Sequence, residues 1–119
     1  MARQRVLVVD DHADTAELLA TMVTWLGHDT RCAHSGADAL KVARDFDPDL
    51  VLLDLQLPDV LGYELVSELR ERPRYIAAVT CWGRDEDRVR SYRAGLDQHV
   101  VKPIDLPRLR QILAAASRS

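Results

Sequence analysis

The sequence of 119 residues has the length of one domain, and we expect residues 1–119 to form a single unit. Its formal net charge of −3, with basic residues scattered along the chain, argues against direct binding of nucleic acid or of an anionic membrane. No apolar run approaches the roughly 18–20 residues of a membrane span. Because Asp10 and Asp11 interrupt the only early apolar stretch, we expect no signal peptide and a cytoplasmic protein.

The first apolar run, residues 5–10, is rich in β-branched side chains and predicts a strand that ends in acid. The following segment predicts a helix, with Asp14 or Thr15 as its cap and Gly27 at its end. The apolar positions that recur there at helical spacing are Leu18, Leu19, Met22, Val23 and Leu26.

A weaker strand at 30–33, read as a sheet edge, precedes a second helix that begins after Gly36 and closes near Pro48. One face of this helix carries Ala39, Leu40, Ala43 and Phe46. Residues 50–54 then form a second continuous apolar run that ends in acid.

Pro58 and Gly62 mark a loop, after which a third helix carries Leu65, Val66 and Leu69. Residues 76–80 predict the fourth strand. The helix expected at 85–93 is unusually polar, and Val89 and Tyr92 are its expected apolar anchors.

Val100 and Val101 form a short fifth strand, and a last helix is lined by Leu106, Leu109, Ile112 and Leu113. Strands that alternate with helices indicate right-handed βαβ units, and continuous apolar strands suit a sheet covered on both faces. The fold class expected is therefore α/β: a flavodoxin-like, doubly wound, five-stranded parallel sheet of order 2-1-3-4-5 with five helices.

Acidic residues end the two strands that flank the reversal of strand order. Asp10 and Asp11 follow the first strand and Asp54 closes the third, so this topology brings three carboxylates into one crevice. Thr80 and Lys102 end the fourth and fifth strands on the same rim. Carboxylates this close repel by about 1 kcal/mol in water and about 4 kcal/mol at an effective dielectric of 20, at ~4 Å. A Mg²⁺ ion and a lysine would compensate them, and a carboxylate beside both can attack phosphorus.

The sequence resembles the response-regulator receiver family of two-component signalling over nearly its full length, and most closely the receivers attached to hybrid sensor kinases. The matching pieces are Val-Val-Asp-Asp at 8–11, Leu-Leu-Asp-Leu-Gln-Leu-Pro at 52–58, Gly62, Thr80, Ala94-Gly95 and Val101-Lys102-Pro103, with Gly27, Ala33, Gly36, Ala39 and Leu40 in the second βα unit.

The resemblance implies a phosphoacceptor signalling switch in a phosphorelay, with Asp54 as the phosphoacceptor. It implies that Asp11 binds Mg²⁺ directly, that Asp10 acts through bound water, and that Asp54 and the backbone carbonyl of Gln56 complete the protein ligands. Lys102 would pair with the phosphoryl oxygens, and the bond from Lys102 to Pro103 is expected to be cis. The implied donor is a sensor histidine kinase or a histidine phosphotransfer protein.

The implied readout departs from the family pattern. Thr80 would move to hydrogen-bond the phosphoryl group, and His99 stands where the family has an aromatic switch, which would add pH sensitivity near the reference pKa of ~6.5. Cys81 would narrow the space into which Thr80 moves. Trp82, like Gln56, would tune the access of water to the phosphoryl group and the lifetime of that group.

Plainer interpretations remain open for several of these residues. Trp82 could pack on the rim, His99 could be a buried packing residue, and Cys81, like Cys32, is expected to be an inert reduced thiol. The charged run at 84–88 could be a solvated helix face or, with the last helix, a surface for dimerisation or partner docking.

Three functions are compatible with these residues. The first is the phosphorylation switch, which catalyses only its own phosphorylation and dephosphorylation and turns over no external substrate. The second is a pseudo-receiver, a phosphorylation-independent interaction module. The third, an aspartate-nucleophile phosphohydrolase, generally needs a second acid where this chain has Gln56. We expect either a stand-alone regulator or a module of a larger kinase.

Overall fold

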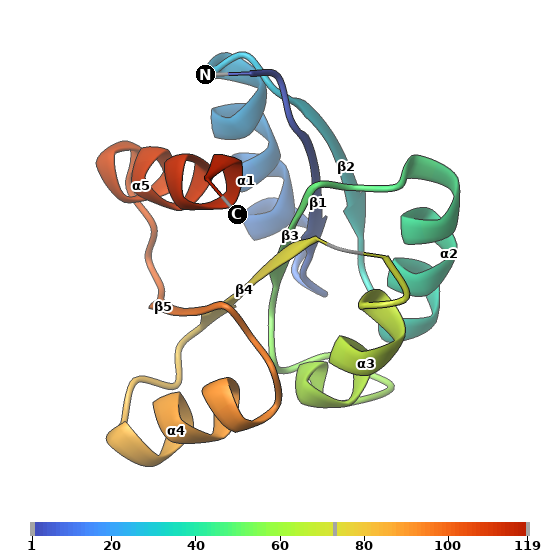
Figure 1. The fold of residues 1–119 in the computed structure, drawn as a ribbon, viewed down its shortest axis with the longest axis vertical. Helices are drawn as coiled ribbons and strands as arrows, with labels where there is room; N and C mark the ends of the chain where they lie inside the picture. Colours follow the sequence, from blue (N-terminus) through green and yellow to red (C-terminus); the bar gives the residue numbers. More distant parts are fainter. Residues whose placement is uncertain (1, 73, 119) are drawn as a thin grey trace.

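The computed structural model describes residues 2–72 and 74–118. Its five parallel strands lie in the order β2-β1-β3-β4-β5, and five α-helices accompany them, so the predicted fold class is confirmed (Figure 1). The strands are β1 (Arg5–Val9), β2 (Asp29–Ala33), β3 (Leu50–Leu53), β4 (Tyr75–Thr80) and β5 (Gln98–Val101). The helices are α1 (Ala13–Trp25), α2 (Gly36–Phe46), α3 (Val66–Leu69), preceded by a 3₁₀ turn η1 (Gly62–Leu65), α4 (Asp85–Arg93) and α5 (Leu106–Ser117).

The central strands are apolar along their length because both of their faces are covered. In β1, Val6 and Val8 pack with α1 and α5, whereas Leu7 and Val9 face the core beneath α2 and α3. Both sets are buried almost completely. At roughly 25 cal/mol per Å² of apolar surface removed from water, these two clusters supply the main driving force for folding.

The first helix begins earlier than the sequence predicted. Its N-cap is His12, whose ring makes no capping hydrogen bond, and the expected caps Asp14 and Thr15 lie within the first turn. The Asp10 carboxylate accepts a hydrogen bond from the His12 amide at 2.9 Å, so the chain turns directly from the strand end into the helix. Gly27, with φ of 96°, ends α1 as predicted, and the adjacent amides bond back to the last turn.

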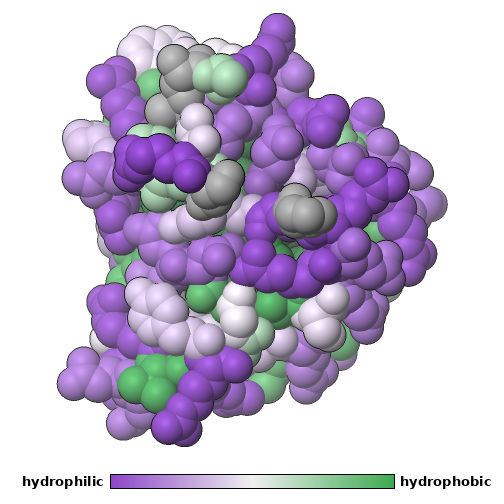
Figure 2. Space-filling view, in the orientation of Figure 1, coloured by the Kyte–Doolittle hydropathy of each residue, from purple (hydrophilic) through white to green (hydrophobic). Residues whose placement is uncertain are grey.

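The fourth helix contradicts the expectation about its anchors. Val89 and Tyr92 are 47% and 58% exposed, and Ser91 is the buried residue of the helix. Figure 2 shows a hydrophobic patch in the region of α4 (at the lower left) among hydrophilic atoms. The helix lies against the edge strand β5 and turns a small polar side chain inward, because a serine permits closer approach than valine or tyrosine. Leu18 of α1, another predicted core position, is also exposed.

Gly62 allows the chain to return close to the end of β3. A Cβ at this position would lie 2.7 Å from the Asp54 carbonyl oxygen and 2.9 Å from the Leu55 Cα, closer than real side chains come. The Gly62 amide donates to the Leu55 carbonyl at 2.9 Å. Within the described ranges, no helix has both the length and the apolar character that a bilayer crossing needs.

Candidate functional site

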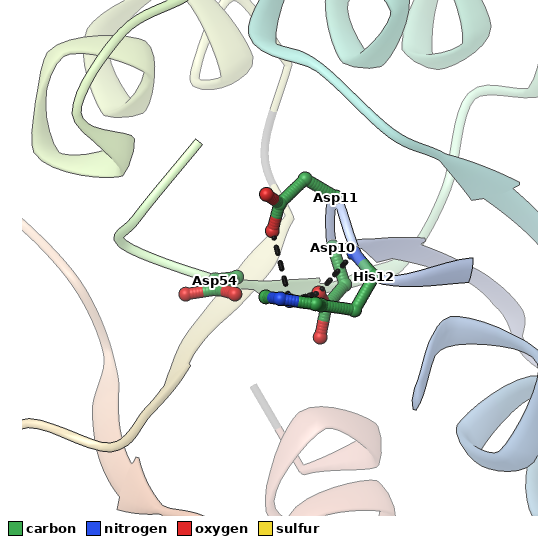
Figure 3. A group of neighbouring side chains, drawn as sticks. All are labelled: Asp10, Asp11, His12 and Asp54. Carbon is green, nitrogen blue, oxygen red and sulfur yellow. Dashed lines mark hydrogen bonds and ion pairs between the residues drawn. The ribbon is translucent and has the colours of Figure 1, made fainter. Parts of the chain in front are cut away.

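Asp10 and Asp54 lie side by side because they follow paired strands. Val9 and Leu53 are register partners in β1 and β3, and the Asp54 amide donates to the Val9 carbonyl at 2.9 Å. Figure 3 shows these two carboxylates in one cluster with the carboxylate of Asp11 and the ring of His12. The prediction that strand-end geometry gathers these three acids is confirmed.

Lys102 brings a positive charge to the two buried acids. Its ammonium donates to Asp10 Oδ2 at 2.8 Å and to Asp54 Oδ2 at 3.2 Å, while its amide donates to the Thr80 carbonyl at 2.8 Å. The bond from Lys102 to Pro103 is cis, as predicted. Lys102 is therefore placed to compensate both carboxylates at once.

Burial and these contacts oppose one another in setting the ionisation of the pair. Asp10 and Asp54 are 2% and 5% exposed. Burial, the largest influence, raises the pKa of Asp54 above its ordinary value, although the Gln56 amide and the Lys102 charge act to lower it. Burial, again the largest influence, acts to lower the pKa of Lys102, but the hydrogen bond to Asp10 and the two negative charges outweigh it, so this pKa is raised.

Gln56 contributes its backbone to the pocket. Its amide donates to Asp54 Oδ1 at 3.0 Å, while its side chain is exposed. Asp54 therefore has one oxygen held by Gln56 and the other by Lys102, which fixes the orientation of the carboxylate.

Thr80 and His99 both contact the loop that follows β4. The buried Thr80 hydroxyl accepts a hydrogen bond from the Trp82 amide at 3.1 Å. His99, 2% exposed, has Nε2 at 2.6 Å from the Trp82 carbonyl and Nδ1 at 2.6 Å from the Ser91 hydroxyl. A carbonyl only accepts, so Nε2 carries a proton, and Nδ1 is left to accept from Ser91 in the neutral ring. His99 thus points inward and links this loop to α4.

The Trp82 ring lies on the partly buried rim rather than free in solvent. It stacks on the ring of Tyr63, with the two centroids 6.5 Å apart. The guanidinium of Arg90 lies over the Tyr63 ring, 4.4 Å from its centroid. Cys81 beside it is exposed. Trp82 is therefore held at its amide, its carbonyl and its ring, as packing on the rim requires.

The sequence interpretation missed His12. Its Nδ1 lies 3.1 Å from Asp11 Oδ1 and 3.4 Å from Asp10 Oδ1, although its side chain is 74% exposed. The only sequence signal was its position directly after the acidic pair, which does not reveal that the ring turns back onto the carboxylates.

The donor atoms of this pocket fit a small divalent cation. One donor atom from each of Asp10, Asp11, His12 and Asp54 can be chosen so that all lie within 4.8 Å of one another. Carboxylate oxygens at a partly open site are the ligands that Mg²⁺ takes, with water completing its shell. The single ammonium of Lys102 cannot neutralise three carboxylates. A divalent cation bound beside it would balance the remaining negative charge.

Comparison with known proteins gives consistent matches across the chain. The model of the response regulator receiver domain matches residues 6–114. The response regulator protein PilR of Pseudomonas aeruginosa is 36% identical over 99% of this chain and 27% of its own length. The regulatory protein AtoC of Escherichia coli is 33% identical over 97% of this chain, which spans only 25% of that relative. The polar-differentiation response regulator DivK of Brucella ovis is 35% identical over 87% of both proteins.

Solved structures match the whole fold as well. A CheY-like response regulator receiver domain from Methylobacillus flagellatus has a TM-score of 0.84 at 30% identity, covering 97% of this chain and 99% of that one. A CheY-like receiver domain protein from Methanospirillum hungatei has a TM-score of 0.89 at 26% identity, covering 98% and 96%.

Proposed function

The chain belongs to the response regulator receiver domain family of two-component signalling, and from this premise we propose that Asp54 accepts a phosphoryl group in a Mg²⁺-dependent reaction. The observation that carries the proposal is the Asp54 carboxylate itself. It stands at the end of β3, 3.2 Å from the Lys102 ammonium and within one cluster with Asp10 and Asp11. A carboxylate beside a lysine and a cation site is equipped to attack phosphorus.

In the proposed reaction, an Asp54 carboxylate oxygen attacks the phosphorus of a phosphohistidine on a histidine kinase or phosphotransfer protein. The new O–P bond replaces the N–P bond, and the donor imidazole leaves with the electron pair of that bond. Lys102 neutralises charge on the phosphoryl oxygens. Bound Mg²⁺ would supply further charge neutralisation, and the residues that would hold it are Asp11, Asp54 and the Gln56 carbonyl, with Asp10 acting through water.

The readout of phosphorylation begins at Thr80. Its hydroxyl, turned toward the new phosphoryl group, gives up the hydrogen bond from the Trp82 amide that it accepts in this structure. Because His99 holds the Trp82 carbonyl and the Ser91 hydroxyl, the change reaches α4. Gln56, Cys81 and Trp82 border the route by which water would reach the phosphoryl group.

The proposal extends to the setting in which the switch works. It acts in the cytoplasm and turns over only its own phosphoryl group. The exposed side chains of Val89 and Tyr92 support partner docking or dimerisation through α4 and α5.

A pseudo-receiver remains the second candidate, and one observation favours it. Trp82 is held at three points, through Thr80, His99 and Tyr63, so the loop that has to move is firmly tied. A domain of this kind would bind partners without taking up phosphate.

Intact-mass spectrometry with Mg²⁺ and acetyl phosphate separates the two candidates. We expect the protein to gain one phosphoryl group, with a rate that rises with Mg²⁺ concentration. Asp54→Asn should gain none, and Asp45→Asn, which alters an exposed acid of α2, should match the wild type. No uptake at any Mg²⁺ concentration would favour the pseudo-receiver.

A further inference from the structure

His12 is placed where it can extend the chemistry of the acidic pocket. As the N-cap of α1 it could accept a hydrogen bond from the first helical turn, but its side chain makes no such bond. Instead, Figure 3 shows its ring beside the carboxylates, with the Asp11 side chain on one side and Asp54 nearby. The ring is therefore directed to the pocket and not to the helix.

The spacing of the atoms matches that of ligands on one ion. For a first-row cation with ligands at about 2.1 Å, adjacent ligand atoms lie roughly 3.0–3.4 Å apart and opposite ones roughly 4.2 Å. His12 Nδ1 is 3.1 Å from Asp11 Oδ1 and 3.4 Å from Asp10 Oδ1. The whole group, including Asp54, spans at most 4.8 Å.

Asp10 is less available than Asp11 as a direct ligand. Its Oδ1 accepts the His12 amide at 2.9 Å and its Oδ2 accepts the Lys102 ammonium at 2.8 Å. Asp11 is exposed, and among the described residues its carboxylate pairs with the imidazole of His12. The oxygens of Asp54 are also engaged, Oδ1 by the Gln56 amide at 3.0 Å and Oδ2 by the Lys102 ammonium at 3.2 Å, the longest of these four contacts. The direct donors at the open side of the pocket are then Asp11 and the nitrogen of His12, with Asp54 Oδ2 as the third.

A nitrogen donor changes which ions such a site prefers. Mg²⁺ takes oxygen ligands almost exclusively, whereas imidazole suits Zn²⁺, Ni²⁺ and Cu²⁺. We propose that His12 makes this pocket a mixed nitrogen and oxygen site that binds Zn²⁺ more tightly than Mg²⁺, the two ions competing for the same carboxylates. This inference rests on the proposed function, since it takes the acidic pocket as the divalent-cation site.

Isothermal titration calorimetry of the whole chain with ZnCl₂ and MgCl₂ tests the proposal. His12→Ala should weaken Zn²⁺ binding at least tenfold and change Mg²⁺ binding less than twofold, and His12→Asn should do the same. Asp11→Asn should weaken both ions. The matched control is His34→Ala, which alters another exposed histidine near Asp10 and should leave both affinities unchanged.

Nuclear magnetic resonance of ¹⁵N-histidine protein supplies a direct readout of ligation. One equivalent of Zn²⁺ should shift the His12 Nδ1 resonance, and excess Mg²⁺ should reverse the shift by competition. Zn²⁺ binding that survives His12→Ala unchanged, or that depends on His34, would overturn the inference and leave the Mg²⁺ site standing. If Asp11→Asn alters neither affinity, the cation pocket of the proposed function fails as well.

Discussion

At the scale of single residues, the pocket holds more negative charge than its surroundings compensate. Asp10 and Asp54 share one ammonium, from Lys102, and both acids are nearly inaccessible to water. Burial dominates the raised pKa of Asp54 even with the lysine beside it. Removing this excess of negative charge should therefore stabilise the folded protein, whether a bound cation compensates it or a substitution neutralises the carboxylate.

The first prediction follows from the sign of this shift. Because the folded state binds the Asp54 proton more tightly than the unfolded state, the folded protein loses stability as the pH rises from 3.8 through the raised pKa. Asp54→Asn removes that loss. In urea denaturation at pH 7 without Mg²⁺, we expect the variant to have a larger free energy of unfolding than the wild type, and Asp45→Asn to show no gain. A less stable Asp54→Asn would contradict the account.

A second buried histidine gives a pH prediction of its own. The His28 Nδ1 accepts a hydrogen bond from the Gln4 amide at 3.0 Å. Burial, the largest cause, lowers the pKa of His28 below 6.5, and the charge of Arg3 acts in the same direction. The unfolded chain therefore binds more protons below pH 6.5, so the free energy of unfolding should fall as the pH drops from 6.5 toward the lowered pKa.

Thermal melts between pH 5 and 8 check this dependence. His28→Gln should flatten the fall, because its side chain does not titrate, whereas His34→Gln at an exposed position should leave it as in the wild type. An unchanged slope in His28→Gln would mean that another group is responsible.

At the scale of elements, α4 differs from the other helices in how it is attached. Its only buried residue is Ser91, whose hydroxyl is bonded to His99 of β5, and its apolar side chains are exposed. Sequence periodicity predicted the opposite, because it assigns valine and tyrosine to a core without knowing the closeness of the approaching strand. A helix with so few buried apolar contacts should open easily.

The third prediction concerns this attachment. Ser91→Ala leaves the buried His99 Nδ1 without its donor, which costs about 1–3 kcal/mol. Hydrogen exchange followed by mass spectrometry should show faster exchange in α4 of the variant, with little change in α2. Ser67→Ala, at an exposed position in α3, is the control. Equal exchange in Ser91→Ala and the wild type would mean that the hydroxyl does not hold the helix.

At the scale of the whole molecule, the order of strands explains why so much of the site could be predicted. Asp10 and Asp54 end apolar runs, and a doubly wound sheet places those ends together, so their proximity and that of Lys102 followed from topology. The start of α1 at His12 and the turn of its ring did not follow from topology. The first depends on the hydrogen bond from the His12 amide to Asp10 and the second on the contact of the ring with the acidic pair, and periodicity encodes neither. The inward orientation of the His99 ring likewise depends on its hydrogen bond to the loop that carries Trp82.

The fourth prediction treats the protein as a single cooperative unit. A cation that binds only the folded state stabilises it, by about 1.4 kcal/mol at ten times its dissociation constant. Calorimetric melts with increasing MgCl₂ should show a rising Tm for the wild type and a nearly constant one for Asp11→Asn. A similar rise in both proteins would place Mg²⁺ outside the acidic pocket.

The central claim is that Asp54 carries the phosphoryl group, and chemical trapping tests it most directly. After incubation with Mg²⁺ and acetyl phosphate, borohydride reduces an aspartyl phosphate to homoserine, which peptide mass spectrometry can locate. The account predicts homoserine at position 54 and none in the Asp54→Asn variant. Homoserine at position 10 or 11, or label that persists in Asp54→Asn, would contradict it.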